Sequence, residues 1–372
     1  MMPLSVLIQA RPNLFQSVGG DTTQVQMTRE HLRGLGVRAE ISLNYRADVS
    51  AFDLVHIFNA YYPHQALLFA RNARRQGKRV VLSPIFIPPG AIPHGNPLER
   101  GWMSWLDSFR ALWPVQSLYR RVAKGSRDAA EALLLRKSAR ACEKELARLI
   151  HFALPNSVSE QKCFTRRFRF PADRCRIVPN GVEERFGECS AECEQAWEHL
   201  RGRALCVGGI MPNKNQLNLA IAARKAGVFL TLVGATPVPR YLEKVRRLEG
   251  PGLAILPPQP REALKGLYRV SHVHALVSHF ETTGLVNLEG ALHGCRIVAS
   301  DRGYMRDYLS GHAHWCDPND VDSIAAALRR AMAEPKGYEF AEEIRRRFTW
   351  REAARQTLAA YELALFLPPV SS

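Results

Sequence analysis

The stretch VHALVSHFETTGLVNLE, residues Val273–Glu289, decides the fold class of this chain. Its first six residues form a short, mostly apolar run, which is typical of a strand buried on both faces of a parallel sheet. The run ends in polar residues and Gly284, and apolar residues then recur at helical spacing as far as Leu288. A strand that passes through a short turn into a helix is the repeating unit of α/β proteins.

The same alternation continues along most of the 372 residues. Amphipathic helical patterns occupy Thr22–Leu35, Gln216–Lys225, Tyr241–Leu248 and Val321–Ala333. The alternation predicts an α/β protein with two doubly wound, Rossmann-like domains, and we expect them to face each other across a ligand-binding cleft. Short apolar runs predict strands at Leu4–Ala10, Ala39–Asn44, Asp53–Asn59, Arg79–Phe86, Phe152–Asn156, Arg176–Pro179, Ala204–Gly208, Phe229–Gly234, Ala254–Leu256, Val273–Ser278, Arg296–Ser300 and His314–Asp317.

Turn residues near the middle of the chain mark the boundary between the two domains. Val178-Pro179-Asn180-Gly181 joins a strand end to turn-forming residues, and a fresh strand begins at Ala204. We place domain one at residues 1–180 and domain two at residues 200–348. A C-terminal helical segment then occupies residues 349–372.

An insertion in domain one interleaves aromatic and basic residues. Pro88–Pro97 is rich in Pro and Gly, and Trp102, Trp105 and Trp113 follow it. Aromatic and basic side chains together suit a membrane-facing or lipid-acceptor surface, whereas an ordinary lid helix would bury the aromatic rings. The sequence leaves both alternatives open.

The charge of the chain narrows the classes of partner. Lys and Arg number 51 against 35 Asp and Glu, a net charge of +16, and such a chain attracts polyanions such as nucleic acid, anionic lipid or phosphorylated small molecules. Because no recognisable nucleic-acid-reading motif is present, we expect no specific nucleic-acid partner. The cysteines lack a zinc-site spacing, and neither a bilayer-spanning apolar run nor a signal peptide is evident. We therefore expect a cytoplasmic protein with reduced thiols.

Three segments at expected strand ends could bind a phosphorylated ligand. Gly19 and Gly20 precede a helix, where backbone N–H groups can approach an anion. Lys214 follows the first strand of domain two, where a cation could reach a diphosphate. Glu281 and Glu289 enclose a helix start whose free N–H groups could bind an anion. Since carboxylates are poor phosphate ligands, sugar hydroxyls are the natural partners of the two glutamates.

Each segment also has an ordinary structural interpretation. The glycine pair is equally compatible with a plain strand-to-helix turn, and Lys214 with a surface lysine in a loop. Glu281 could be a favourable charge at a helix start. A merely solvated role fits Glu289 poorly, because it lies among apolar residues such as Leu288 and Leu292.

Together these motifs resemble the retaining glycosyltransferases of family 4, which have the GT-B fold. That family's Val-Gly strand end, phosphate-binding lysine and Glu-x7-Glu spacing correspond to Lys214, Glu281 and Glu289. The pair Gly19-Gly20 is similar to the family's N-terminal glycine loop. The resemblance covers most of the chain, and its specific motifs are concentrated in residues 176–300.

The resemblance implies a role for each matched position. Lys214 would bind the donor diphosphate, Glu281 the hydroxyls of the donor sugar, and Glu289 the ribose. Domain one would be the acceptor side, domain two would bind the nucleotide sugar, and the C-terminal helix Trp350–Phe366 would return to domain one. Further donor contacts would come from backbone and loop residues: Gly19, Gly20, Gly209, Gln259, Thr283, Gly284, Leu285 and Val286.

The chain also departs from the family pattern. Gly209 stands where the family often has Arg, which removes one phosphate-binding charge, and Thr283 replaces a common Phe. His56, in an expected strand, fits either a cleft histidine or a hydrogen-bonded core histidine. The only Asp-x-Asp, Asp320–Asp322, opens an expected helix, where acids act as caps, so we expect no metal site and a metal-independent reaction.

The resemblance and the charge together predict a membrane-associated sugar transferase. We expect retaining transfer of a sugar from a nucleotide diphosphate donor, UDP- or GDP-linked, without another cofactor. The expected acceptor is a glycan or lipid-linked molecule of bacterial cell-surface polysaccharide or lipopolysaccharide synthesis, and the expected location is the inner face of the plasma membrane, whose surface is anionic. Two alternatives stay open, namely a GT-B-like epimerase or phosphorylase and a basic nucleic-acid-binding protein.

Overall fold

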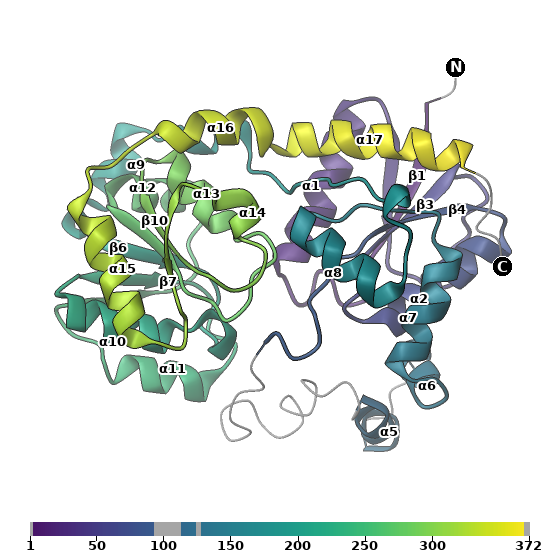
Figure 1. Ribbon diagram of the computed structural model, residues 1–372, viewed down its shortest axis with the longest axis horizontal. Helices are drawn as coiled ribbons and strands as arrows, with labels where there is room; N and C mark the ends of the chain where they lie inside the picture. Colours follow the sequence, from purple (N-terminus) through teal and green to yellow (C-terminus); the bar gives the residue numbers. More distant parts are fainter. Residues whose placement is uncertain (1–2, 93–112, 124–127, 368–372) are drawn as a thin grey trace. The chain divides into compact units, whose positions relative to one another are not determined.

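The chain divides into two compact units (Figure 1). The computed structural model describes residues 3–92, 113–123 and 128–367. Among the described residues, unit 1 takes in 3–89, 113–123, 128–181 and 350–367, and unit 2 takes in 90–92 and 182–349. Residues 182–199, which the sequence analysis left outside both domains, therefore cluster with unit 2.

Unit 1 is built on a five-stranded parallel sheet with the strand order β2-β1-β3-β4-β5. All residues of β1 and β3 are buried, which explains why these strands are continuous apolar runs rather than alternating patterns. The strands are β1 (Ser5–Gln9), β2 (Arg38–Ser42), β3 (Leu54–Phe58), β4 (Arg79–Ser83) and β5 (Phe152–Ala153).

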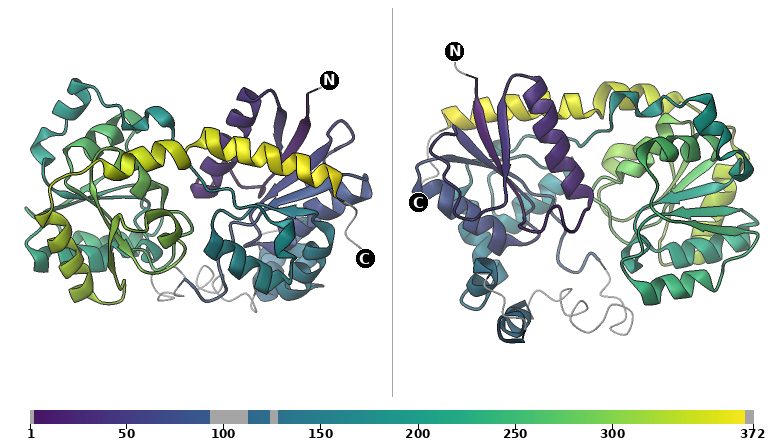
Figure 2. Two further views of the ribbon diagram at one scale, coloured as in Figure 1. Left: turned by 45° about the horizontal axis from the view of Figure 1, so that its top comes forward. Right: turned by 180° about the vertical axis from the view of Figure 1, so that it is seen from behind.

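Helices cover both faces of this sheet. Helix α1 packs against α17, and α2 packs against α7. Since parallel crossovers are right-handed, the reversal of strand order at β1 puts α1 and α2 on opposite faces. Figure 2 shows α17 in yellow alongside α1 in purple. The helices are α1 (Gly20–Gly34), α2 (Pro63–Arg75), α5 (Trp113–Ala123), α6 (Ala129–Leu134), α7 (Ala139–Leu149), α8 (Val158–Phe168) and α17 (Trp350–Phe366).

Unit 2 is built on a six-stranded parallel sheet with the order β11-β10-β9-β6-β7-β8. This is the order of a Rossmann sheet, in which the first and fourth strands of the unit are neighbours. Its strands are β6 (Ala204–Val207), β7 (Leu230–Val233), β8 (Leu253–Leu256), β9 (Val273–Leu276), β10 (Arg296–Ser300) and β11 (Ala313–Cys316). Its longer helices are α10 (Gln216–Ala226), α11 (Pro239–Arg246), α12 (Arg261–Val270), α13 (Leu285–Leu292), α15 (Val321–Ala333) and α16 (Glu339–Arg347).

Alternate residues of each central strand in unit 2 enter two separate cores. In β6, Ala204 and Cys206 belong to the core that contains residues of α10 and α15. Leu205 and Val207 belong to the core that contains residues of α12, α13 and α16. Because both faces are covered, every residue of β6 is buried.

The strand predictions are confirmed with one exception. Arg176–Pro179 is not a strand, although Arg176 N–H donates to the Ala153 carbonyl at 3.0 Å and Val178 N–H to the Pro155 carbonyl at 2.9 Å. The neighbouring strand β5 has only two residues, and Pro155 follows after one further residue, so the strand offers too short an edge for a regular ladder.

The aromatic insertion is described only in part. Trp102 and Trp105 lie outside the described residues, whereas Trp113 is buried in unit 1 beside Tyr62 and His64. For Trp113 the interpretation as a buried aromatic is therefore correct. Within the described ranges, no helix is both long and apolar enough to cross a bilayer.

Candidate functional site

The candidate site of unit 2 lies where the strand order reverses. Strands β6 and β9 are neighbours, and the helices that follow them, α10 and α13, contribute to the cores on opposite faces of the sheet. In open α/β sheets, ligands bind beyond the carboxyl ends of the strands at such a point. The two loops that begin there, residues 208–215 and 277–284, carry the lysine and the first glutamate predicted from the sequence.

Lys214 and Glu281 form an ion pair between Nζ and Oε1. The side chains are 24% and 13% exposed, so the pair is partly buried but still open to a ligand. A charge-assisted contact of this kind fixes both groups in one place. The structure thus brings together two residues that lie far apart in the sequence, as their predicted roles require.

The loop that carries Lys214 is tied to the loop that carries Glu281. Asn215 is buried in the left-handed backbone region at φ 60°, and its Nδ2 donates to the carbonyls of Val277 at 3.2 Å and Pro318 at 2.7 Å. The N–H of His279 donates to the Asn213 carbonyl at 2.8 Å. These bonds hold the position of the ion pair without using either charged side chain.

Gly209 lies in the lysine loop and is held by a side chain from the next helix. Its carbonyl accepts from Gln216 Nε2 at 2.9 Å, and Gln216 Oε1 accepts from the N–H of Met211 at 3.3 Å. Gly208, at φ 147°, passes so close to Gly234 that a Cβ on Gly234 would lie 2.1 Å from the Gly208 carbonyl oxygen. The loop is therefore a closely packed turn.

The backbone of Glu281 packs closely against a glycine, Gly303, that was not predicted from the sequence. The N–H of Tyr304 donates to the Glu281 carbonyl at 2.8 Å. Gly303 adopts φ 83°, and a Cβ there would lie 2.2 Å from the Glu281 carbonyl oxygen and 2.7 Å from its nitrogen. Only a glycine allows this approach without a shift of the backbone. A glycine shortly after strand β10 was the only available sequence signal.

Glu289 has a different partner from the other two predicted residues. Its carboxylate accepts a hydrogen bond from the Tyr268 hydroxyl at 3.0 Å. Burial raises the pKa of Glu289 above its usual range, an effect that the hydrogen bond from Tyr268 and the nearby Arg261 partly offset. Burial also raises the pKa of Tyr268 well above 10, so this hydroxyl remains a donor. The site thus consists of a Lys214–Glu281 pair and a separately held Glu289.

The remaining predicted residues of unit 2 lie on two loops. Gly284, at φ 67°, is the N-cap of α13, and the first N–H groups of a helix have no partner within it. Thr283 is buried, whereas Leu285 and Val286 are half-buried. Gln259 is half-buried, and its side chain donates to the Pro257 carbonyl at 3.0 Å.

Unit 1 carries its own polar cluster where its strand order reverses. Gly20 begins α1, and the N–H of Gly19 donates to a side chain in the first turn of that helix. Asp21, next along the chain, pairs with Arg11 at 2.6 Å and accepts from Asn59 Nδ2 at 3.3 Å. Arg11 and Asn59 follow β1 and β3, the two strands at the reversal. The two glycines were predicted from the sequence, whereas the Asp21 cluster was not.

Two further residues have structural roles. His56 is buried, its Nδ1 lying 2.6 Å from the Tyr361 hydroxyl and its Nε2 2.9 Å from the Ser83 hydroxyl, and burial lowers its pKa to about 3. It is thus the hydrogen-bonded core histidine of the two alternatives.

Asp320 caps α15 by accepting from the Asp322 N–H at 2.8 Å, which confirms the helix-cap interpretation. Among the described residues, no group of three or more His, Cys, Asp or Glu could hold a metal ion.

Comparison with known proteins finds similarity to glycosyltransferases. Residues 196–356 match the family model for glycosyl transferases group 1. The chain is 26% identical over 223 residues to O-antigen chain mannosyltransferase B of Escherichia coli, an alignment that covers 53% of this chain and 57% of that protein. It is 28% identical over 238 residues to D-inositol 3-phosphate glycosyltransferase of Saccharomonospora viridis, with 56% and 55% covered. The chain thus spans a little over half the length of these curated relatives.

Solved structures share the whole fold at low sequence identity. HepE of Anabaena, in complex with UDP-glucose, superposes with a TM-score of 0.71 at 13% identity and covers 97% of this chain and 100% of that one. Sucrose-phosphate synthase of Thermosynechococcus elongatus gives a TM-score of 0.69 at 15% identity, with 97% and 98% covered. These likenesses confirm the expected fold class, two Rossmann-like α/β domains of the GT-B type.

Proposed function

We propose that this chain is a glycosyltransferase that transfers a sugar from a nucleotide diphosphate donor. The observation that carries the proposal is the Lys214–Glu281 ion pair at the strand-order reversal of unit 2. The match of residues 196–356 to glycosyl transferases group 1 supports it, because that segment contains both residues of the pair. The alternatives of an epimerase, a phosphorylase or a nucleic-acid-binding protein gain no support from the relatives found.

Lys214 and Glu281 would bind two different parts of the donor. The ammonium of Lys214 would meet the diphosphate, whose negative charge grows as the bond to the sugar breaks. Glu281 would then accept hydrogen bonds from sugar hydroxyls. Before the donor binds, Glu281 is the partner of Lys214, so the two groups are held in place and their charges balanced.

Glu289 and the start of α13 would bind the rest of the nucleotide. The carboxylate of Glu289 is fixed by Tyr268 and retains lone pairs for ribose hydroxyls. The free N–H groups at the N-terminus of α13 would meet phosphate oxygens. HepE of Anabaena has been solved with UDP-glucose, which supports a UDP-linked donor for this chain as well.

Transfer would retain the anomeric configuration. We assign attack by the acceptor on the same face that the diphosphate leaves, with the leaving phosphate taking the acceptor proton. Lys214 would stabilise the departing charge, and no metal ion would be required. An acceptor in cell-surface polysaccharide synthesis is supported by the similarity to an O-antigen mannosyltransferase. The net charge of +16 supports work at an anionic membrane surface.

Replacement of the lysine tests the proposal. Lys214→Ala should lower the rate of donor consumption at least ~10-fold, the scale of one lost contact to the leaving group. Lys225→Ala is the matched control, because Lys225 forms an exposed ion pair with Asp322 elsewhere in the same unit. A panel of UDP-, GDP-, ADP- and dTDP-sugars in a thermal-shift assay would identify the donor first.

The donor selected in that panel also tests the claim that no metal ion is needed for donor binding. Calorimetric titration with the selected donor in the presence of chelator should give the same affinity as in its absence. Equal rates for Lys214→Ala and the wild-type chain would refute the assignment of the lysine. Loss of donor binding in chelator would refute metal independence alone.

A further inference from the structure

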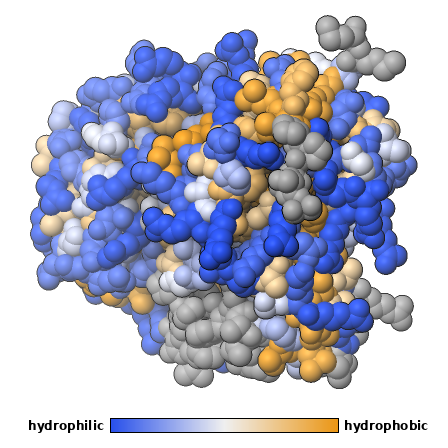
Figure 3. Space-filling model, turned by 45° about the vertical axis from the view of Figure 1, so that its right-hand side comes forward, coloured by the Kyte–Doolittle hydropathy of each residue, from blue (hydrophilic) through white to orange (hydrophobic). Residues whose placement is uncertain are grey.

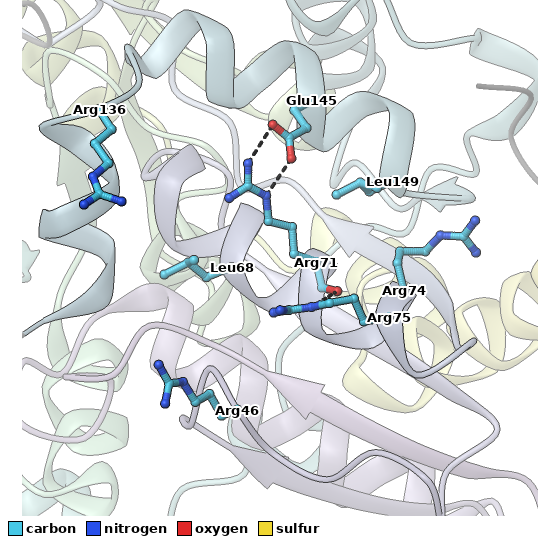
Figure 4. Close-up of a pocket in the computed structure, with 8 residues that line it drawn as sticks. All are labelled: Arg46, Leu68, Arg71, Arg74, Arg75, Arg136, Glu145 and Leu149. Carbon is cyan, nitrogen blue, oxygen red and sulfur yellow. Dashed lines mark hydrogen bonds and ion pairs between the residues drawn. The ribbon is translucent and has the colours of Figure 1, made fainter.

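An arginine-lined pocket lies in unit 1, apart from the strand ends described above. It has a volume of about 870 Å³, within the usual range for ligand pockets. Figure 4 shows the side chains that line it. They are Arg46, Leu68, Arg71, Arg74, Arg75, Arg136, Glu145 and Leu149.

The single carboxylate of the pocket is already neutralised. Glu145 pairs with Arg71 through two hydrogen bonds of 2.6 and 2.9 Å, and it also pairs with Lys137. These contacts hold the pKa of Glu145 at about 2, so it stays ionised and engaged with its two cations. It therefore offers no spare charge to the other arginines.

Four arginines of this pocket lack a carboxylate partner among the described residues. Arg74 lies 3.0 Å from a ring nitrogen of His151, which leaves Arg46, Arg75 and Arg136. Within the part of the chain that the structure describes, Arg46, Arg75 and Arg136 form no ion pair, and the one side-chain hydrogen bond from these three runs from Arg75 Nε to the Arg71 carbonyl at 3.3 Å. Figure 4 shows all three guanidinium groups directed toward the space around Leu68. Like charges so arranged repel one another unless an anion joins them.

The cluster is not explained by helix chemistry alone. Arg75 lies in the last turn of α2, where a cation is favoured by the helix dipole. Arg46, however, lies in the loop between β2 and β3, and Arg136 lies in the turn between α6 and α7. Three separate elements thus supply one guanidinium group each to the same space.

The position of the pocket separates it from the Asp21 cluster of unit 1. Helix α2 begins after the carboxyl end of β3, at the edge that carries the Asp21 cluster, and ends just before β4 begins. Arg75 is thus at the opposite edge of the sheet from Asp21. A ligand here would therefore occupy a site separate from both the Asp21 cluster and the Lys214–Glu281 pair of unit 2.

We propose that Arg46, Arg75 and Arg136 bind a phosphate-bearing ligand. Guanidinium groups match phosphoryl oxygens in geometry and charge, and Leu68 and Leu149 add an apolar wall for the non-phosphate part of the ligand. The volume exceeds the needs of an inorganic ion and suits a sugar phosphate or a phospholipid headgroup. Both sources present the same chemistry, a phosphoryl group attached to a small organic body.

An apolar surface on helix α5, next to the pocket, is the reason to test a lipid headgroup as the ligand. Helix α5 packs on α6, whose first residue, Ala129, lines an adjoining pocket with Arg46 and Arg75. Along α5, Val115, Leu118 and Tyr119 are 57%, 53% and 38% exposed. Figure 3 shows hydrophobic side chains near the lower edge of this face, in the part of the molecule where Figure 1 places α5. Exposed apolar and basic side chains close together are typical of a lipid-facing surface.

The test compares two triple variants of the full chain. Arg46→Gln, Arg75→Gln and Arg136→Gln are combined in one variant, which removes the cluster. Its matched control removes the same charge from exposed positions of unit 2 by combining Arg224→Gln, Arg246→Gln and Arg247→Gln. One arm measures cosedimentation with vesicles of phosphatidylcholine alone or with phosphatidylglycerol, and the other measures calorimetric binding of glycerol 3-phosphate.

We expect the cluster variant to bind at least one of the two probes about tenfold or more weakly than the control variant does. Loss with vesicles alone identifies a lipid headgroup, and loss with glycerol 3-phosphate alone identifies a free phosphate ester. Equal binding by the cluster and control variants, or no binding of either probe by the wild-type chain, overturns the proposal. Neither arm uses a sugar donor, so the result is independent of the proposed transferase activity.

Discussion

The close backbone contact between Gly303 and Glu281 gives the sharpest prediction about the candidate site. Gly303→Ala places a methyl group 2.2 Å from the Glu281 carbonyl oxygen and 2.7 Å from its nitrogen. Both atoms belong to the backbone, so no side-chain rotation relieves the clash. The loop that carries Glu281 must therefore move, and with it the carboxylate that pairs with Lys214.

The size of the effect follows from these distances. To reach an ordinary contact, the gap between the new methyl group and the carbonyl oxygen must widen by roughly 1 Å. A displacement of about 1 Å at a reacting group can lower a rate by ~10²-fold. The left-handed φ adds a loss of stability of about 1–2 kcal/mol for any residue with a Cβ.

Gly311→Ala separates the two effects. Gly311 has φ 80°, nearly that of Gly303, but a Cβ there meets no atom within 4 Å. Both variants should thus lose stability in urea unfolding, while only Gly303→Ala should lose donor turnover and donor affinity in calorimetry. If the two variants turn over donor equally fast, Gly303 is not a positioning residue for Glu281.

Three other predictions concern single side chains. Burial raises the pKa of Glu160 to about 7 from 4.5, so the folded chain keeps a proton that the unfolded chain releases. The free energy of unfolding should therefore fall as pH rises from about 4.5 to 7. Urea unfolding of Glu160→Gln at about pH 5 and about pH 7.5 should lack this pH-dependent fall in stability. Tyr268→Phe removes the hydrogen bond to Glu289 and should weaken donor binding severalfold, with a stability loss of about 1 kcal/mol, and unchanged affinity would contradict a ribose role for Glu289. Asp21→Asn weakens the ion pair with Arg11 and should raise the KM for acceptor more than the KM for donor, a split that steady-state kinetics would reveal.

The pattern of apolar runs was sufficient to predict the fold. Strands such as β6 are buried on both faces, and a run that is apolar throughout has few other stable arrangements in a protein with intervening amphipathic helices. The one wrong strand, Arg176–Pro179, failed because its partner β5 is too short, and the length of a neighbouring strand is not encoded in the run itself.

The candidate site was predicted in part for the same reason. Lys214 and Glu281 follow strands with clear boundaries, and the ends of parallel strands meet at one edge of a sheet, so their approach follows from local pattern and topology. Their environment did not follow from local pattern. The close backbone contact at Gly303 and the bond from Tyr268 to Glu289 depend on which loops and helices approach one another.

The sequence by itself determined the order and type of the elements, the excess of positive charge and the residues with chemistry to offer. The tertiary structure alone decided which of those residues share a space. The arginines at positions 46, 75 and 136 are unremarkable singly in the sequence, because each has polar or basic neighbours. They form a pocket only because a loop, a helix end and a turn converge on Leu68, and such convergence is a property of packing rather than of any local pattern.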